Sequence, residues 1–260
     1  MAIQSATAQK YFTGRNELGW TFGASNYSGD LSHGANMDQY HISGGVYFKR
    51  NWSSYFTNRL QVSYLKISGT DVGNRSYSAR NLSFQTSIYE FSDMVEFNFQ
   101  KFGMNYNDNQ WTPYFFSGLA LFMFDPARLE NTDIHLRNLK TEGQKRGYSL
   151  LQPSVPIGFG IKTTAKPKKN HGIWVLGIEG YWRKTFTDYL DDVNGNYPSY
   201  KATVDKQGQG AADYSHAQVL NGGAPYSPGT MRGDKHLKDW YYFVGFTLAF
   251  RFPGKVCPAM

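Results

Sequence analysis

The charged residues that could carry chemistry are scattered singly through apolar and glycine-rich stretches of the chain. They are Glu17, Glu96, Glu179, Arg183 and Arg251. Carboxylates beside guanidinium groups could form an acid–base set, but catalysis also requires a nucleophile, a base and an orienting group in one place. The sequence shows no such set. We therefore interpret these residues as a salt-bridge network inside a folded domain and predict a protein that is not an enzyme, with no catalytic, metal or cofactor site.

Three further carboxylates, Asp188, Asp191 and Asp192, lie within one short segment. Oxygen ligands at close spacing could bind calcium, but these aspartates lack the EF-hand pattern. Their spacing favours a hydrogen-bond network at the base of a loop, with calcium binding as the alternative.

A single cysteine, Cys257, excludes an internal disulfide and any zinc site with two or more thiolates. In an oxidising compartment an unpaired thiol indicates an intermolecular disulfide. The alternative is an inert residue in a terminal tail. The histidines are scattered, without a pair at metal-ligand spacing.

Composition narrows the class of protein further. The chain has 260 residues, of which 17% are aromatic and 18% charged, with a formal net charge of +7. Disordered segments are poor in aromatic residues, so a folded domain is expected. The most apolar stretch, Tyr114–Phe124, is shorter than the roughly 18 residues that a transmembrane helix needs. The positive charge is modest and dispersed, which does not indicate nucleic-acid binding.

The dominant signal along the chain is strict alternation of apolar and small or polar residues, which is typical of β-strands. It is clearest near the C-terminus, where seven apolar residues share one face: Trp240, Tyr242, Val244, Phe246, Leu248, Phe250 and Phe252. The other predicted strands cover residues 17–25, 40–49, 59–64, 90–99, 111–124, 155–162 and 174–183. The stretch 111–124 is apolar on both faces, so its two sides stay unassigned.

The links between these strands alternate in length. Long links cover residues 27–38, 67–81, 125–149 and 187–238, and short ones cover 51–55, 101–110 and 165–170. This alternation predicts an up-and-down barrel whose hairpins end on the same two rims. In outer-membrane barrels the long loops are extracellular, which places the short turns and both termini in the periplasm.

Composition of the second face decides which side of the barrel meets lipid. A soluble ligand-binding barrel would carry charged residues outside and apolar residues inside. Here the second face carries isolated charges and many glycines, which suit a narrow lumen. The glycines are Gly19, Gly23, Gly45, Gly158, Gly160, Gly177 and Gly245. We therefore predict an all-β protein: an eight-stranded antiparallel transmembrane barrel like OmpA and OmpX, in the bacterial outer membrane.

One acidic residue does not fit this pattern, because Asp93 falls on the outward face between Phe91 and Val95. Either it lies near the rim, or a bulge shifts the register there. At the N-terminus, Ala6-Thr7-Ala8 is similar to the end of a secretory signal peptide. The expected organisation is a signal-peptide remnant (1–8), a barrel (9–253) and a periplasmic tail (254–260).

Several segments together resemble the PorG family, the outer-membrane barrel component of the type IX secretion system. In order along the chain they are Asn16–Gly19, Gly23–Leu31, Glu96–Phe99, Thr112–Tyr114 with Ser117–Leu119, Thr185–Val193 and Asp239–Phe252, with Cys257 just beyond. Departures from the family are the missing signal-peptide core, Asp93 where a small apolar residue is expected, and a long last loop.

This resemblance implies a non-enzymatic part of a secretion machine that exports proteins bearing a C-terminal sorting domain. Family members associate with a periplasmic ring built by the lipoprotein PorK and its partner PorN, so these proteins and outer-membrane lipid are the expected partners. The PorK-like lipoprotein is then the candidate for a disulfide with Cys257. The alternatives are a small porin or transport barrel and a lipid-modifying barrel enzyme, for which His33 is the only loop histidine close to a strand with serine nearby.

Overall fold

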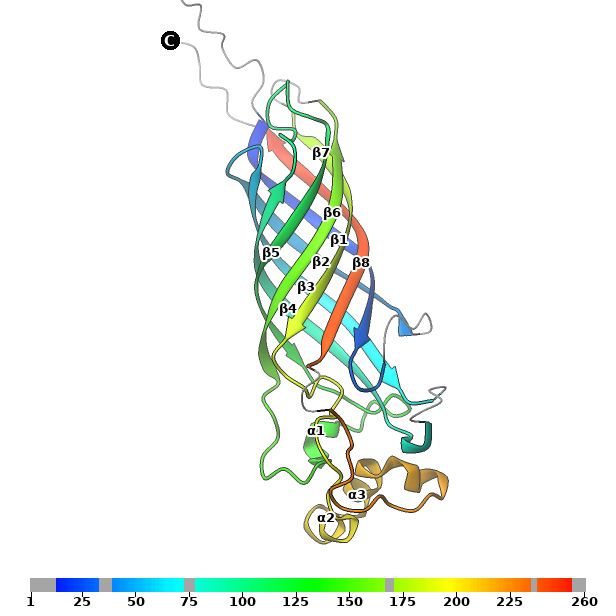
Figure 1. Ribbon diagram of the computed structural model, residues 1–260. Helices are drawn as coiled ribbons and strands as arrows, with labels where there is room; N and C mark the ends of the chain where they lie inside the picture. Colours follow the sequence, from blue (N-terminus) through cyan, green and yellow to red (C-terminus); the bar gives the residue numbers. More distant parts are fainter. Residues whose placement is uncertain (1–12, 33–38, 73–77, 167–170, 235–237, 254–260) are drawn as a thin grey trace, which may run out of the picture.

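The computed structural model describes residues 13–32, 39–72, 78–166, 171–234 and 238–253. In it, eight antiparallel strands close into one barrel in which each strand pairs with its neighbours in the chain and β8 pairs with β1 (Figure 1). The strands are β1 (Thr13–Ser28), β2 (His41–Asn51), β3 (Phe56–Thr70), β4 (Ser83–Asn98), β5 (Trp111–Phe124), β6 (Leu151–Thr164), β7 (Ile173–Thr185) and β8 (Trp240–Pro253). The predicted fold class is confirmed.

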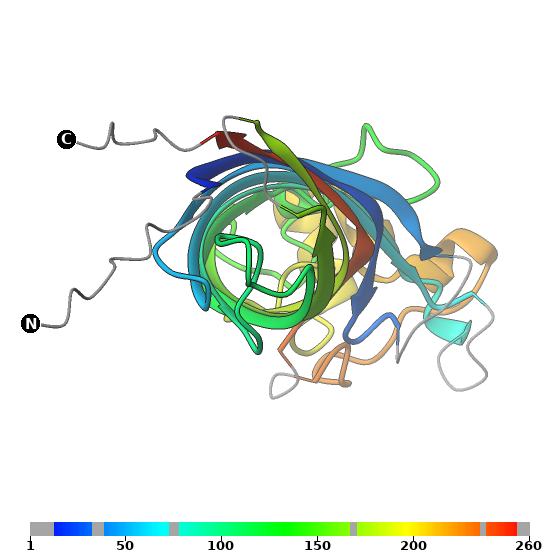
Figure 2. The same cartoon turned by 90° about the horizontal axis from the view of Figure 1, so that it is seen from above.

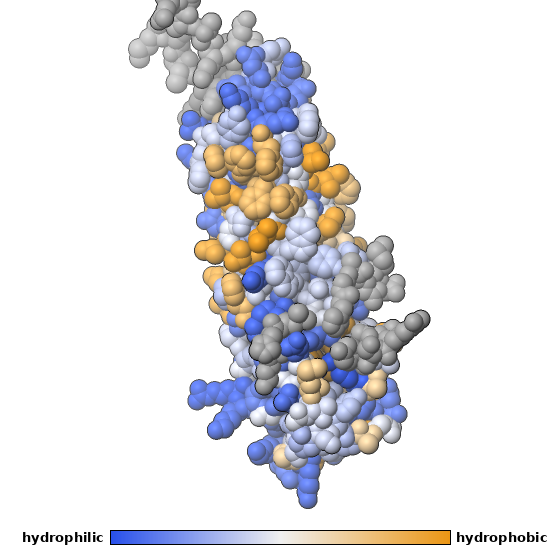
Figure 3. All heavy atoms as spheres, viewed as in Figure 1, coloured by the Kyte–Doolittle hydropathy of each residue, from blue (hydrophilic) through white to orange (hydrophobic). Residues whose placement is uncertain are grey.

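Apolar side chains face outward, as the alternation predicts. Along β8, Val244 and Phe246 are exposed whereas the flanking Phe243 and Thr247 are buried. Hydrophobic residues gather across the middle of the barrel, between two hydrophilic ends (Figure 3). An exposed apolar belt of this kind is a property of barrels that span a membrane.

Strand β5, whose sides the sequence leaves open, carries mainly aromatic rings inward and both aliphatic and aromatic side chains outward, Trp111 among them. Its alternate residues Tyr114, Phe116, Ala120, Phe122 and Phe124 are buried in the barrel. Leu119 and Leu121 between them are exposed. Both faces are apolar because the interior contains aromatic packing as well as charges.

Glycines on neighbouring strands provide the space that these inward rings occupy. A Cβ atom added at Gly19 would lie 2.5 Å from the ring of Tyr47, and one at Gly160 would lie 2.7 Å from the ring of Tyr114. The glycine-rich face therefore follows from a narrow interior that takes large side chains from only some positions.

The two ends of the barrel differ in construction. At the end where β1 begins and β8 ends, here called the terminus end, the links are 52–55, 99–110 and 165–172. Residues 99–110 fold back over the opening, with Phe102 and Met104 buried (Figure 2). This segment is thus a plug rather than the simple turn expected for 101–110.

The opposite end, here called the loop end, carries a cap of helices that the strand pattern does not predict (Figure 1). They are η2 (Ser78–Arg80), α1 (Leu136–Leu139), α2 (Tyr200–Gln207), α3 (Gln209–Ser215) and η3 (Ala217–Asn221). No helix in the described part of the chain is long and apolar enough to cross a membrane. The expected signal-peptide remnant (1–8), the tail (254–260) with Cys257, and His33 lie outside the described residues.

Candidate functional site

The interior of the barrel holds a lumen charge network, formed by acidic and basic side chains from several strands. Its members are Glu17, Lys49, Arg59, Glu90, Glu96, Lys162, Glu179, Arg183 and Arg251, and each of them is buried. The five charged residues singled out from the sequence all lie in this network. Arg59, Glu90 and Lys162 were not singled out there, although each shares the inward parity of its strand, and Lys49 is one of the isolated charges that the sequence places on the inward face.

Glu96 is the most highly connected member. Its carboxylate lies 2.7 Å from Lys49 Nζ, 2.8 Å from Lys162 Nζ and 3.4 Å from Arg59 Nη1. Three cations around one carboxylate compensate the loss of its hydration inside the barrel.

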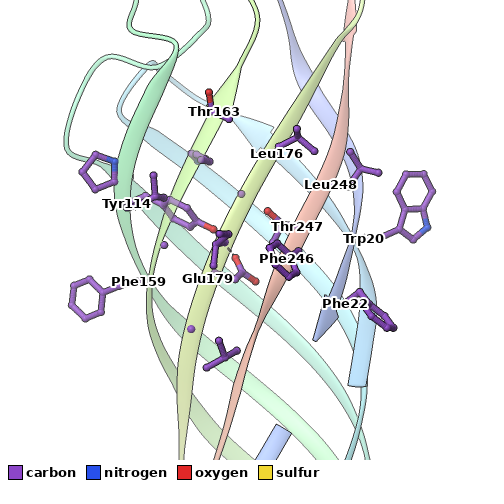
Figure 4. Close-up of a pocket in the computed structure, with 18 of the residues that line it drawn as sticks. Trp20, Phe22, Tyr114, Phe159, Thr163, Leu176, Glu179, Phe246, Thr247 and Leu248 are labelled. Atoms are coloured by element: carbon purple, nitrogen blue, oxygen red, sulfur yellow. Dashed lines mark hydrogen bonds between the residues drawn. The ribbon is translucent and has the colours of Figure 1, made fainter. Parts of the chain in front are cut away.

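Arg59 links this cluster to Glu179 on β7. Its Nη1 and Nη2 atoms donate to the two carboxylate oxygens of Glu179 at 2.7 and 2.8 Å. The Tyr114 hydroxyl donates to the same carboxylate at 2.6 Å (Figure 4). The bidentate geometry of Arg59 and Glu179 is the strongest form of the arginine–carboxylate pair. Together with the Tyr114 bond, it fixes the relative positions of β3, β5 and β7.

Two further pairs complete the network. Arg183 donates to Glu90 through Nε at 2.8 Å and Nη2 at 2.6 Å, and the Tyr241 hydroxyl donates to Glu90 at 2.6 Å. Nearer the plug, Arg251 Nε donates to Glu17 at 2.7 Å and its Nη1 donates to the carbonyl oxygen of Gly103 at 2.6 Å. The network therefore also holds the plug in place.

A second group of charges, the loop-end acidic cluster, lies beneath the cap and consists of Asp188, Asp191, Asp192 and Asp239. The Tyr27 hydroxyl lies 2.6 Å from Asp191 Oδ2 and 2.8 Å from Asp239 Oδ1. A hydroxyl has one proton to donate, so two ionised carboxylates cannot both be satisfied by it. Burial, with the charge of Asp239 adding to it, raises the pKa of Asp191 well above its usual value, and burial also raises that of Asp239.

Asp192 and Asp188 differ in their partners. Asp192 accepts from the Thr141 hydroxyl at 2.5 Å and the Tyr148 hydroxyl at 2.9 Å, while burial raises its pKa to about 6. Asp188 is 2% exposed, its carboxylate accepts no hydrogen bond from the part of the chain that the structure describes, and Lys238 Nζ lies 3.9 Å away. Burial, together with the charges of nearby acidic groups, raises the pKa of Asp188 to about 7.

Backbone amides donate to the second carboxylate oxygens of Asp191 and Asp239. Leu190 N donates to Asp239 at 2.9 Å and Val193 N donates to Asp191 at 2.8 Å. Among the described residues no group of histidine, cysteine or acidic side chains is arranged to hold a metal ion. The arrangement is that of a hydrogen-bond network which fixes the base of the last loop to β1 and β8.

The outer wall offers a different surface. An apolar groove of about 1010 Å³ follows β6, β7, β8 and β1, with Phe159, Leu176, Leu248 and Trp20 projecting from the wall, whereas Tyr114 and Glu179 project inward (Figure 4). Lipid chains are the natural contact for such a surface in a transmembrane barrel.

Asp93 interrupts this apolar exterior on the far side of the barrel. The β3–β4 register runs without a break from Phe56–Phe97 to Thr70–Ser83, so the bulge considered from the sequence is wrong. Asp93 faces outward opposite Leu60 and Leu119 and accepts a hydrogen bond from Asn58 Nδ2 at 2.6 Å.

The exterior is apolar and the interior is polar and charged, which is the polarity of an outer-membrane β-barrel rather than of a soluble barrel. The interior contains paired charges and packed rings, without a nucleophile placed beside a base and an orienting group among the described residues.

Comparisons with known proteins add a family and several similar folds. A family model described as a domain of unknown function (DUF6089) matches residues 2–207. No curated protein matches the chain significantly. Similar solved structures include Neisserial surface protein A (8% identity, TM-score 0.43, 92% of this chain and 99% of that one). Others are OprG from Pseudomonas aeruginosa (10%, 0.43, 94% and 99%) and Ail of Yersinia pestis (9%, 0.39, 92% and 99%).

Proposed function

The chain belongs to the DUF6089 family, a domain of unknown function, and we propose that it is a structural component of the type IX protein secretion system. In this role it anchors a PorK/PorN-type periplasmic ring to the outer membrane. The observation that carries the proposal is the closed interior: paired charges fill the barrel, and Phe102 and Met104 plug one end of it. Because the interior of the barrel is filled, a partner protein can contact only its outer wall and its two ends. The segments that resemble the PorG family, which follow one another in order along the chain, are the basis for naming the type IX secretion system.

The orientation follows from the lengths of the links. Outer-membrane barrels carry long loops outside and short turns in the periplasm. The cap at the loop end is then extracellular, and the terminus end, with the plug, faces the periplasmic ring.

A recess at the terminus end provides a surface for that contact. It has a volume of about 460 Å³ and is lined in part by Tyr106, Asn107, Trp111 and Lys166. The Lys166 ammonium lies 5.1 Å from the centre of the Tyr106 ring. Aromatic side chains are enriched at protein–protein interfaces, and amides add directional hydrogen bonds. Lys166 begins the basic sequence Lys-Pro-Lys-Lys at 166–169, of which only Lys166 lies within the described part of the chain.

Affinity purification of the tagged protein from native membranes, followed by mass spectrometry, tests the proposal. We expect a PorK-like lipoprotein and a PorN-like protein to copurify, and the double variant Tyr106→Ala/Asn107→Ala to reduce their yield. Lys201→Ala, on α2 at the opposite end, is the matched control and should leave the yield unchanged. Recovery of the intact barrel without either protein would contradict the assignment.

Two further measurements separate this role from its alternatives. Planar-bilayer recording should show no steady conductance, whereas stable open channels would favour a small porin. Non-reducing electrophoresis of native envelopes should show a larger species that Cys257→Ser abolishes, as the proposed link to the lipoprotein requires. A monomer band alone in both proteins would remove the disulfide.

A further inference from the structure

A pocket outside the lumen charge network and the loop-end acidic cluster lies on the outer wall at the loop end of β4 and β5. Beyond the last β5 residue, the bridge between Gln85 and Ala127 extends the β4–β5 pairing. A second bridge, between Ala127 and His135, folds the following loop back along it. This brings the His135 ring beside Asp125, with Nδ1 2.9 Å from Oδ2. The open recess that these residues line, here called the rim pocket, measures about 380 Å³.

The rim pocket has one apolar and one polar side. Tyr89 and Met123, both about half exposed, belong to the apolar exterior of the barrel. Ser87, Asp125 and His135 form the polar side of the pocket. The Ser87 hydroxyl lies 3.0 Å from the hydroxyl of Tyr64. The pocket therefore crosses the boundary between the apolar belt and the polar loop end, where the head group of a lipid meets its acyl chains.

The polar side favours sugar hydroxyls over phosphate. Sites that recognise phosphate rely on arginine or lysine, and among the described residues neither type lines the rim pocket. The pocket instead presents a carboxylate, an imidazole and hydroxyl groups, which together accept and donate hydrogen bonds without a strong net charge. The ring of Tyr89 adds a flat apolar surface with a polar edge.

We propose that the rim pocket binds a glycolipid of the adjoining leaflet, with its sugar hydroxyls at Asp125 and His135 and an acyl chain along Tyr89 and Met123. Lipid binding there is independent of any contact with a periplasmic ring, because the pocket lies at the opposite end of the barrel from the recess at Tyr106.

The test uses the purified full-length barrel in phosphatidylcholine nanodiscs and an alkyl maltoside that carries a photoactivatable diazirine in its chain. We expect labelling to concentrate on peptides that contain Tyr89 or Met123. Asp125→Ala and His135→Ala should each lower that labelling about tenfold, because each removes a hydrogen bond to a sugar hydroxyl. Ser87→Ala gives a milder second variant.

Asp133→Ala is the matched control, since it removes an exposed aspartate of the same loop outside the pocket. An alkyl phosphocholine probe of equal chain length should label the pocket weakly. Barrel integrity is checked by the different gel migration of heated and unheated samples. Labelling spread evenly around the belt, labelling unchanged in folded Asp125→Ala protein, or equal labelling by the phosphocholine probe would each overturn the proposal.

Discussion

The lumen charge network and the loop-end acidic cluster are both buried, but they differ in charge balance. Each glutamate of the network lies within 2.8 Å of a lysine or arginine nitrogen. In the cluster, Asp191 and Asp239 share one tyrosine hydroxyl, and among the described residues the nearest cation to Asp188, Lys238 Nζ, is 3.9 Å away. Charges at the depth of the hydrocarbon are neutralised by fixed partners, whereas carboxylates under the cap can be neutralised by protons instead.

The largest loss of stability is expected when a cation is removed from the lumen charge network. Arg59→Met leaves Glu179 buried without its partner, and we expect a loss of about 3–5 kcal/mol in the free energy of unfolding. Urea-induced unfolding in lipid vesicles measures this. Adding Glu179→Met should recover much of the loss, and Arg50→Met, at an exposed position of β2, should change little. A loss below about 1 kcal/mol for Arg59→Met would show that the pair is not desolvated.

A smaller effect is expected from filling the space that inward rings occupy. Gly160→Ala places a methyl group against the Tyr114 ring and the carbonyl oxygen of Ile178. Overpacking of this kind costs about 1–3 kcal/mol. Gly210→Ala, where nothing lies within 4 Å of the added atom, is the control in the same unfolding assay. Equal stability of the two variants would mean that the interior is looser than described.

Protonation of the loop-end acidic cluster should make the stability of the cap depend on pH. The pKa values of Asp188 and Asp192, about 7 and about 6, lie above the ordinary value of about 3.9. The folded cap therefore binds more protons than an unfolded one, and its stability falls as the pH rises from about 4 to about 7. Asp188→Asn should flatten part of this dependence and raise protection at pH 8 by roughly tenfold.

Hydrogen exchange at the amides of Leu190 and Val193, corrected for intrinsic rates, measures this effect. Amides of the barrel strands provide the internal reference, because they lie outside the cap and the loop-end acidic cluster. A cap that becomes more protected as the pH rises would reverse the predicted sign.

The smallest effect is expected on the lipid-facing wall. Asp93→Leu replaces an outward carboxylate opposite Leu60 and Leu119, and we expect a gain on the order of 1 kcal/mol in vesicles. Thermal or urea unfolding checks the change, with Asp133→Leu in the cap as the control. Destabilisation by Asp93→Leu would show that its bond from Asn58 outweighs the cost of the exposed charge.

Alternation was sufficient to predict the strands and the sides of most of them, because a period of two residues translates directly into inside and outside. It could not predict which charges pair. Arg59 and Glu179 lie far apart in sequence and meet only because strand stagger places β3 and β7 on opposite sides of a narrow interior. The inward side of β5 could not be predicted for a related reason, since the inward residues of this strand are as apolar as its outward ones.

The helices of the cap could not be predicted from the sequence because they form only through tertiary contacts. Helix α2 has eight residues, which is too short for stability on its own. Contacts such as that between Arg80 Nη1 and the carbonyl oxygen of Arg232 join separate loops. Short helices of this kind leave little periodic signal. The three aspartates at the base of the last loop were visible in the sequence, but Asp239 and Tyr27 as their partners were not.

The inside-out polarity of the barrel, on which the account rests, is tested most directly by electron paramagnetic resonance with nitroxide labels on neighbouring residues. In bilayers, labels at Leu176→Cys and Ile178→Cys should collide with oxygen dissolved in the hydrocarbon, whereas a label at Thr247→Cys should be shielded from both oxygen and a water-soluble nickel complex. Shielded labels at positions 176 and 178 together with a lipid-exposed label at position 247 would contradict the account.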